Sequence, residues 1–259
     1  MNIFDLTSVD LQKLFFIFVR LTAILMVMPF YGRQVIPVQV KLGLALLLTI
    51  IVSPLISGQN MALAVNSLPG FGFGIFRNVL VGSFIGFIPL LLFAGIRLGG
   101  ELIGVQIGFE ISNVLDPMSQ IRMSLIARFE YLLAILVFIS INGHLYLLEG
   151  IVNSFQIIPL HGSLQTGNFA ESLAVISRDM FIIGLKIAAP VLIALLLTNI
   201  GLGILSRTMP QMNIFLTGFP LQIGVGLVTL GFSIPLFVYL FEKLFYEFIQ
   251  KWLVLISAL

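Results

Sequence analysis

The chain reads Gly99-Gly100-Glu101-Leu102-Ile103-Gly104-Val105-Gln106-Ile107-Gly108-Phe109-Glu110 where a glycine-rich stretch interrupts an otherwise apolar sequence. Gly100, Gly104 and Gly108 recur every four residues, so in a helix they form a bare stripe against which another backbone can pack. Asp116-Pro117 follows, and proline ends a helix because it lacks the amide donor. The pattern predicts a glycine-striped helix that leads into a polar loop. That arrangement suits a movable or pore-lining segment, and equally a tightly packed helix before an ordinary loop.

The composition is that of a membrane protein. Of the 259 residues, 59% are hydrophobic and 9% are charged, far from the balance of a soluble globular protein. The length fits one domain of about six spanning segments of about 20 residues each. The chain has no cysteine, which excludes disulfides and thiolate metal sites. The net charge of +2 gives no argument for nucleic acid as a partner.

Hydropathy predicts an all-α fold of long apolar helices. The predicted segments are residues 14–30, 38–56, 73–96, 125–148, 180–205 and 214–241, followed by an amphipathic tail to residue 259. A strand barrel would show short alternating segments instead. Pro89 and Pro190 lie inside two of the helices, where we expect them to kink or break the helix.

The basic residues outside these segments, counted together with Lys41 near the start of the second segment, show no preference for one side of the membrane. Six simple crossings would place nearly equal numbers on the two sides: Lys13, Arg77, Arg178, Lys243 and Lys251 against Arg33, Lys41, Arg97, Arg122, Arg128 and Arg207. An ordinary polytopic protein has an excess of Lys and Arg on the cytoplasmic side. Two explanations stay open: the segment boundaries are wrong, or partner subunits cover hairpins that do not insert as a simple bundle.

Arg20 and Lys186 are basic residues inside apolar segments. A charge there is costly and normally faces protein or a water-filled cavity. The structural interpretation is that Arg20 reaches the interface or pairs with a carboxylate such as Asp10, and that Lys186 reaches the interface near Pro190. The alternative is a coupling site of a secondary transporter, with Arg20, Lys186 or Glu149 near the midplane of the bilayer.

The sequence offers no recognisable catalytic, cofactor-binding or metal site. It contains no P-loop, and His144 and His161 do not have the spacing of a zinc-binding pair. No serine is accompanied in sequence by the histidine and carboxylate of a hydrolase. We therefore expect a protein that is not an enzyme and that needs no cofactor.

A second polar interruption separates the last two apolar segments. It is an elbow whose notable residues are Arg207, Met209, Pro210, Met212 and Phe215. Methionine is flexible and conforms to varied surfaces, which would suit a gasket around a passing chain. The same residues would also suit ordinary packing beside a turn.

These motifs together resemble the FliR family of flagellar export-gate proteins and its relatives in type III secretion injectisomes, the SctT group. The matching residues include Glu101 to Phe109 with Asp116-Pro117, Gly143-His144, Ser154-Phe155 with Pro159, and the elbow followed by Gly218-Phe219-Pro220. The resemblance covers essentially the whole chain, and its overall pattern favours the flagellar branch. It implies a single export-gate domain over residues 1–259, with N-terminal hairpins to about residue 98, the glycine helix and loop to about residue 128, and C-terminal hairpins beyond.

What the resemblance implies about function is a core subunit of an export complex with FliP and FliQ. Helical hairpins of several chains would wind around a central pore for unfolded flagellar substrates. The complex would lie in the bacterial inner membrane at the flagellar basal body, partly raised above the bilayer plane, with FlhB and FlhA as further partners and membrane lipid around it. That elevation would explain why the basic residues show no preference for one side of the membrane.

The resemblance also implies that the loop after the glycine helix plugs the closed pore. The residues it assigns to this constriction are Gly104, Gln106, Gly108, Phe109, Ile111, Val114, Leu115, Asp116 and Pro117. An apolar constriction excludes water and ions at rest, and an exported chain displaces it. The elbow is the candidate gasket, and Arg20 and Lys186 are candidates for subunit contacts or structural charges. A secondary transporter of a small solute remains the alternative function.

Overall fold

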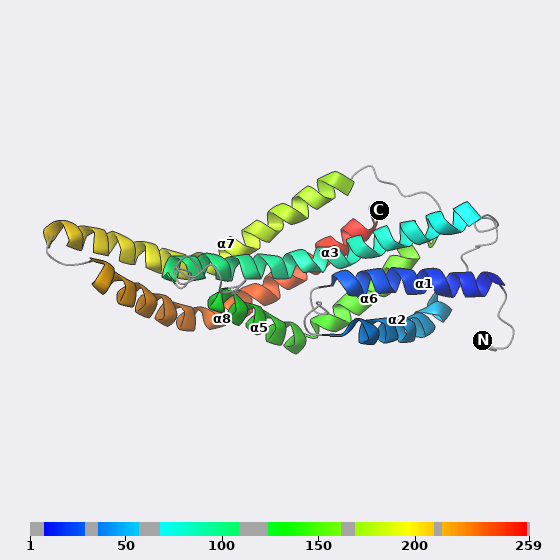
Figure 1. Cartoon of the computed structure of the whole chain (residues 1–259), viewed down its shortest axis with the longest axis horizontal. Helices are drawn as coiled ribbons and strands as arrows, with labels where there is room; N and C mark the ends of the chain where they lie inside the picture. The colour runs from blue at the N-terminus through cyan, green and yellow to red at the C-terminus, as the bar shows by residue number, and fades with distance from the viewer. Residues whose placement is uncertain are drawn as a thin grey trace. The chain divides into compact units, whose positions relative to one another are not determined.

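The computed structural model describes residues 8–28, 36–56, 68–108, 124–161, 169–209 and 214–257 (Figure 1). In chain order its elements are α1 (Ser8–Val27), α2 (Val38–Val52), a short 3₁₀ helix η2 (Ser53–Leu55), α3 (Leu68–Ile107), α5 (Leu125–Ser140), α6 (Gly143–Ile157), α7 (Phe169–Thr208) and α8 (Ile214–Ser257). No strand occurs in these residues. The predicted all-α fold is confirmed.

Four of these helical stretches are long and apolar enough to cross a membrane. They are Val38–Leu55, Pro69–Ile107, Leu173–Thr208 and Gly218–Ile256. The α5 and α6 helices, bent by 72° at the break between them, would add a fifth if they count as one broken span. The expectation of about six crossings is therefore too high for the described residues. The first predicted segment is not among these stretches, and α1 carries Asp10, Lys13 and Arg20, charges that are unfavourable in hydrocarbon.

The helices extend beyond the apolar runs that predicted them, and internal prolines do not break them. Pro89 lies inside α3 and Pro190 inside α7, and both helices are 40 residues long. A break in apolar surroundings would leave further backbone groups without water to bind, so continuing the helix is the less costly solution. Of the expected kink or break, the break does not occur, and a kink at either proline stays a prediction.

The apolar run over residues 125–148, predicted as one segment, forms two helices instead. Ile141 and Asn142 separate α5 from α6, and Asn142 has a φ of 56°. Asparagine tolerates this left-handed conformation better than most residues that carry a β-carbon. A β-carbon on Gly143 would collide with the ring of Phe138. The Asn-Gly pair therefore ends one helix and starts the next.

Replacing Asn142 tests this turn. Asn142→Val is expected to lower the free energy of unfolding by about 1–2 kcal/mol, because a β-branched residue is strained at positive φ. Asn142→Gly is the matched control and is expected to stay within about 0.5 kcal/mol of the parent chain. The measurement is thermal unfolding of the purified chain in detergent. Equal melting temperatures for the two variants would contradict the assigned strain.

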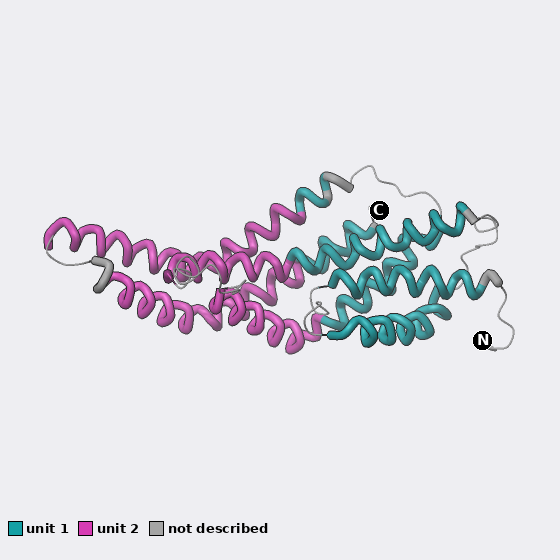
Figure 2. Tube along the Cα trace, in the orientation of Figure 1, with its two compact units in different colours: residues 1–91, 144–175, 248–259 teal, residues 92–143, 176–247 magenta. Residues whose placement is uncertain are grey.

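The helices divide into two compact units (Figure 2). Unit 1 comprises residues 1–91, 144–175 and 248–259, and unit 2 comprises residues 92–143 and 176–247. Each unit is therefore built from segments that are far apart in the sequence. The predicted subdivision of the chain into successive hairpins stays a prediction.

In unit 1, the first part of α3 packs closely against α1. A β-carbon on Gly82 would lie 2.5 Å from the carbonyl oxygen of Arg20, and one on Gly86 would lie 2.6 Å from that of Ile24. These distances leave no room for a side chain. Glycine at this spacing therefore sets the approach of the two helix backbones.

In unit 2, the same device joins the second part of α3 to α7. A β-carbon on Gly95 would lie 2.7 Å from the carbonyl oxygen of Met180, and one on Gly99 would lie 2.8 Å from that of Gly184. Close helix packing by spaced glycines was predicted for this region, but the glycines that contact α7 precede the predicted stripe. Gly100, the first residue of that stripe, packs against Ala127 of α5.

The helix boundaries change the count of basic residues on which the missing bias rests. Most of the basic residues in that count lie within helices, including Lys41 in α2, Arg77 and Arg97 in α3, and Arg178 in α7. Lys41 and Arg77 are only 1% and 2% exposed. A count that treats them as loop charges does not report topology, so the boundaries used for it were wrong.

Candidate functional site

The glycine-rich helix ends at a defined point. α3 stops at Ile107, and the N–H of Gly108 donates to the carbonyl oxygens of Gly104 at 3.2 Å and Val105 at 3.1 Å. Gly108 has a φ of 94°, a backbone conformation that glycine adopts without penalty and that commonly closes helix ends. The chain therefore leaves the helix in a direction set by Gly108, immediately before residues 109–123.

Both ends of the segment 109–123 are fixed in one hydrophobic core of unit 2. Ile103 and Ile107 of α3 and Ile126 of α5 are at most 4% exposed and belong to the same cluster. The remaining buried members are Ala188, Val191 and Leu195 of α7 and Leu230 of α8. The residues on the two sides of 109–123 thus belong to the same packed cluster.

Close helix contacts reinforce this anchor. Gly100 of α3 packs against the backbone of Ala127 in α5. A β-carbon on Gly226 of α8 would lie 2.6 Å from Cγ1 of Ile107. Larger residues at either glycine would push α5 or α8 away from the last turns of α3.

A second polar feature, in unit 1, surrounds Arg20, which is 0% exposed. Its Nε donates to Oδ1 of Asn78 at 2.9 Å, and its Nη1 and Nη2 donate to the carbonyl oxygens of Ile158 at 2.8 Å and Pro159 at 3.1 Å. Its guanidinium also lies 4.8 Å from the ring centre of Phe155, a favourable cation–π distance. Arg20 is therefore held by carbonyl groups and an aromatic ring, and none of these three hydrogen bonds goes to a carboxylate.

Arg77 and Asn78 complete this network, and sequence reasoning missed both. Nη1 of Arg77 donates to the carbonyl oxygen of Pro159 at 2.6 Å, and Nδ2 of Asn78 donates to that of Leu160 at 3.0 Å. Together with Arg20 they bind the turn that follows α6. The available signal was an adjacent Arg-Asn pair in an apolar helix, since polar side chains there normally find buried partners.

Comparison with known proteins assigns the family. Residues 11–248 match the family described as bacterial export proteins, family 1. The chain belongs to the FliR family of bacterial export proteins. It is 33% identical to the flagellar biosynthetic protein FliR of Escherichia coli, covering 96% of this chain and 94% of the relative. It is 35% identical to FliR of Pectobacterium carotovorum, covering 91% and 89%, and 34% identical to FliR of Bacillus subtilis, covering 83% of each.

For this member of the FliR family, the assigned plug lies mostly beyond what the structure describes. Phe109, Ile111, Val114, Leu115, Asp116 and Pro117 fall outside the described residues. Gly104 is buried, Gln106 is half-buried, and Gly108 forms the helix end. The plug therefore stays a prediction, and what the structure adds is the anchor on both sides of it.

The elbow of this FliR relative connects α7 and α8 directly. Arg207 and Met209 are exposed at the end of α7, and Met209 is 56% exposed. Pro210 and Met212 lie outside the described residues, as does the side chain of Phe215 at the start of α8. The described side chains are thus available at a surface, as either a gasket or a packing role would require.

The two helices that meet at this elbow are joined by an amide contact. Nε2 of Gln222 in α8 donates to Oδ1 of Asn199 in α7. An amide pair between apolar helices fixes their register because its polar atoms have few other partners there.

Lys186, farther back on α7, is exposed and close in sequence to Pro190.

Proposed function

We propose that this chain is a core subunit of the flagellar export gate, which forms with FliP and FliQ a pore for unfolded flagellar substrates across the bacterial inner membrane. Residues 109–123 would close that pore at rest. FlhB and FlhA would be further partners at the basal body. The family, shared with proteins named for flagellar biosynthesis, supports a role in the flagellar export apparatus. The pore, its partners and the plug are the proposal.

The observation that carries the plug is the packing of the residues on both sides of 109–123. Ile107 before the segment and Ile126 after it belong to one buried cluster. A loop held at both ends can be displaced by a passing chain and then return, without disturbing the helices that hold it. A flexible linker would lack that property, and a fully packed helix could not move without breaking its core.

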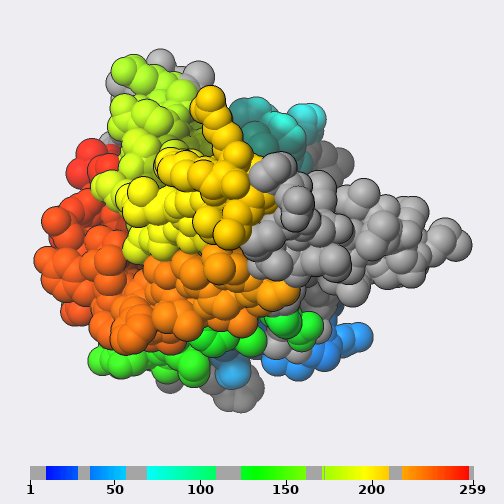
Figure 3. Space-filling model, turned by 90° about the vertical axis from the view of Figure 1, so that its left-hand side faces the viewer, coloured from blue at the N-terminus to red at the C-terminus, as the bar shows by residue number. Residues whose placement is uncertain are grey.

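The exposed apolar surface supports assembly with partners. In the candidate span Gly218–Ile256, only 17% of the most apolar stretch of the helix is buried within the chain. Figure 3 shows the end of α7 and the beginning of α8 side by side on one face. Exposed apolar residues of these two helices include Leu197, Ile204, Leu221 and Val228. Such a surface needs lipid or protein against it, and helices of FliP and FliQ would supply protein.

Arg20 gives no support to the transporter alternative. All three of its guanidinium nitrogens donate hydrogen bonds within unit 1, so they are already engaged by the fold. Lys186 is exposed on α7.

Co-purification tests the proposed function. The tagged chain is expressed with and without FliP and FliQ, extracted in detergent and weighed by native mass spectrometry. We expect a large mixed particle with few copies of this chain, and poor recovery of the chain when it is expressed alone. A stable monomer or homodimer that ignores the partners would overturn the proposal and return attention to transport.

A further inference from the structure

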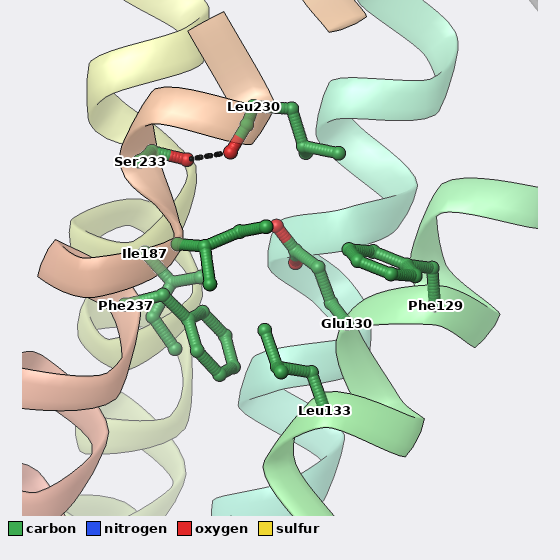
Figure 4. A pocket seen from close by; sticks show the side chains of 8 residues that line it. Phe129, Glu130, Leu133, Ile187, Leu230, Ser233 and Phe237 are labelled. Carbon is green, nitrogen blue, oxygen red and sulfur yellow. Dashed lines mark hydrogen bonds between the residues drawn. The ribbon is translucent and has the colours of Figure 1, made fainter.

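Glu130 is a buried acidic residue in α5 that faces a small cavity in unit 2 (Figure 4). Its side chain reaches from α5 toward Ile187 of α7 and Leu230 of α8, and the residue is 4% exposed. The cavity is otherwise lined by Phe129, Leu133, Ser233, Ile234 and Phe237. A single carboxyl group therefore projects into surroundings that are almost entirely apolar.

The carboxyl group lacks a counter-charge within the described residues. Its Oε2 atom is buried and has no hydrogen-bond partner. Ser233, the other polar side chain at the cavity, donates its hydroxyl to the carbonyl oxygen of Leu230 at 2.8 Å. The ion pairs Arg97–Glu101 and Arg178–Asp179 do not include Glu130. A buried carboxylate without a partner is strongly unfavourable.

The backbone around Glu130 is shaped to hold a carboxyl group. A β-carbon on Gly100 of α3 would lie 3.0 Å from Oε2 of Glu130, so the absence of a side chain at Gly100 makes room for that oxygen. The same glycine packs against Ala127, one helical turn before Glu130. The position of the carboxyl group is thus fixed by close packing of α3 and α5.

The cavity has the size of one small polar group. Its volume is about 10 Å³, which is close to the minimum that admits one water-sized group. A lysine ammonium is compact, whereas an arginine guanidinium is a broad planar fork. The available space therefore favours an ammonium group as the cation that compensates Glu130.

The surface of the helices that line the cavity indicates where this cation comes from. Exposed apolar side chains occur on α5, at Leu132 and Leu136, and on α8, at Phe232 and Leu236. Phe129, which lines the cavity itself, is 42% exposed. An apolar helix laid on such a surface would cover these side chains, and a lysine on that helix would pack its alkyl stem on them while its head reached the carboxylate.

We propose that Glu130 is the docking point for a lysine carried by an apolar helix of a partner subunit. This inference rests on the proposed function and adds to it a specific contact. In the assembled gate the carboxylate and the ammonium would form a buried ion pair that fixes the register of the partner helix. Charge complementarity selects the partner, because a helix without the lysine would leave Glu130 buried and uncompensated.

Zero-length cross-linking tests this contact in the mixed particle formed with FliP and FliQ. An apolar carbodiimide joins a carboxyl group to an amine in direct contact, and mass spectrometry of the digest identifies the joined peptides. We expect the peptide containing Glu130 to be linked to a lysine of a partner subunit. Glu130→Gln should abolish this product, whereas Glu242→Gln, which removes an exposed carboxylate of α8, should leave it intact.

The same variants are compared for assembly. Glu130→Gln is expected to lower the yield of the mixed particle about tenfold relative to the parent chain, since it removes one charge of a buried pair. Glu242→Gln should give the parent yield. The isolated Glu130→Gln chain should melt at or above the parent temperature, because a neutral amide is easier to bury than an unpaired carboxylate.

The outcomes separate this inference from the proposed function. Absence of a mixed particle with the parent chain would overturn the proposed function itself. A normal yield of mixed particle with Glu130→Gln, without a Glu130–lysine product in the parent, would overturn the inference alone. A cross-link between Glu130 and the amine of a phospholipid would show that the cation comes from lipid and not from a partner subunit. A lower melting temperature of the isolated Glu130→Gln chain would show that Glu130 acts only within this chain.

Discussion

Removing residues 113–118 is expected to leave the export gate assembled and to make the membrane permeable to small ions. These residues lie in the middle of the segment 109–123, whose flanking residues Ile107 and Ile126 are packed in one core. The nine residues that would remain between Gly108 and Ser124 can span about 30 Å. The helices on both sides can therefore keep their places while the apolar constriction is lost.

The expected size of the leak follows from the barrier that is removed. An apolar constriction excludes ions because it excludes the water that solvates them. Lowering the barrier by only about 1.4 kcal/mol raises the rate of passage tenfold, so we expect an increase of at least about tenfold. The measurement is ion efflux from liposomes that contain the purified mixed particle, with equal amounts of particle for each variant.

A deletion of equal length elsewhere provides the control. Residues 162–167 lie in the connection between α6 and α7, and their removal shortens the chain by the same number of residues. We expect this variant to remain closed to ions. If the 113–118 deletion assembles normally and its permeability equals that of the parent particle, residues 109–123 do not plug the pore.

The helices of the fold follow largely from hydropathy, but their ends do not. Hydropathy predicts a helix that stops at residue 96, and the glycine pattern predicts a separate helix after it, yet α3 is one helix that continues to Ile107. The polar residues at this point support the helix, because Arg97 and Glu101 form an i, i+4 ion pair at 2.8 Å. Gly95 and Gly99 then pack on α7, and this tertiary contact outweighs the low helix propensity of glycine.

The break between α5 and α6 had a signal in the sequence that hydropathy conceals. Asn142-Gly143 is a turn-forming dipeptide within a run of apolar residues. The mean hydropathy of a long stretch changes little when two of its residues are polar, whereas the backbone conformation at each position depends on the residue that stands there. Turn chemistry therefore decides this boundary, and the apolar run decides only that helices lie on both sides of it.

Pairings between distant residues could not be predicted from the sequence. Glu130 lies in an apolar run, and nothing in the spacing shows that Gly100 and Ser233 come close to its cavity. Likewise, the partners of Arg20 lie 58 to 139 positions away along the chain. Hydropathy and periodicity describe one helix at a time, so contacts between helices need the fold.

Replacing Arg20 by methionine is expected to destabilise the chain strongly. Methionine has a similar length but no donors, so Oδ1 of Asn78 and the carbonyl oxygens of Ile158 and Pro159 would lose the hydrogen bonds that Arg20 now supplies. A buried acceptor left without its donor costs about 1–3 kcal/mol. The carbonyl oxygen of Pro159 keeps the hydrogen bond from Arg77, so two acceptors lose their donor. We expect a loss of at least about 2 kcal/mol, measured as a lower melting temperature and a lower amount of chain in the membrane.

Arg178→Met is the matched control for this loss. Arg178 lies in α7 and its ion pair with Asp179 is exposed, and such pairs contribute about 0–1 kcal/mol. The melting temperature of Arg20→Lys should fall between those of Arg20→Met and Arg178→Met. One ammonium keeps the charge but cannot reproduce the fork of donors that reaches Asn78 and two carbonyls. A melting temperature of Arg20→Met equal to that of Arg178→Met would show that the turn after α6 is held by packing alone. The expected order, with Arg20→Met lowest, follows only if the hydrogen bonds of the guanidinium hold that turn against α1 and α3.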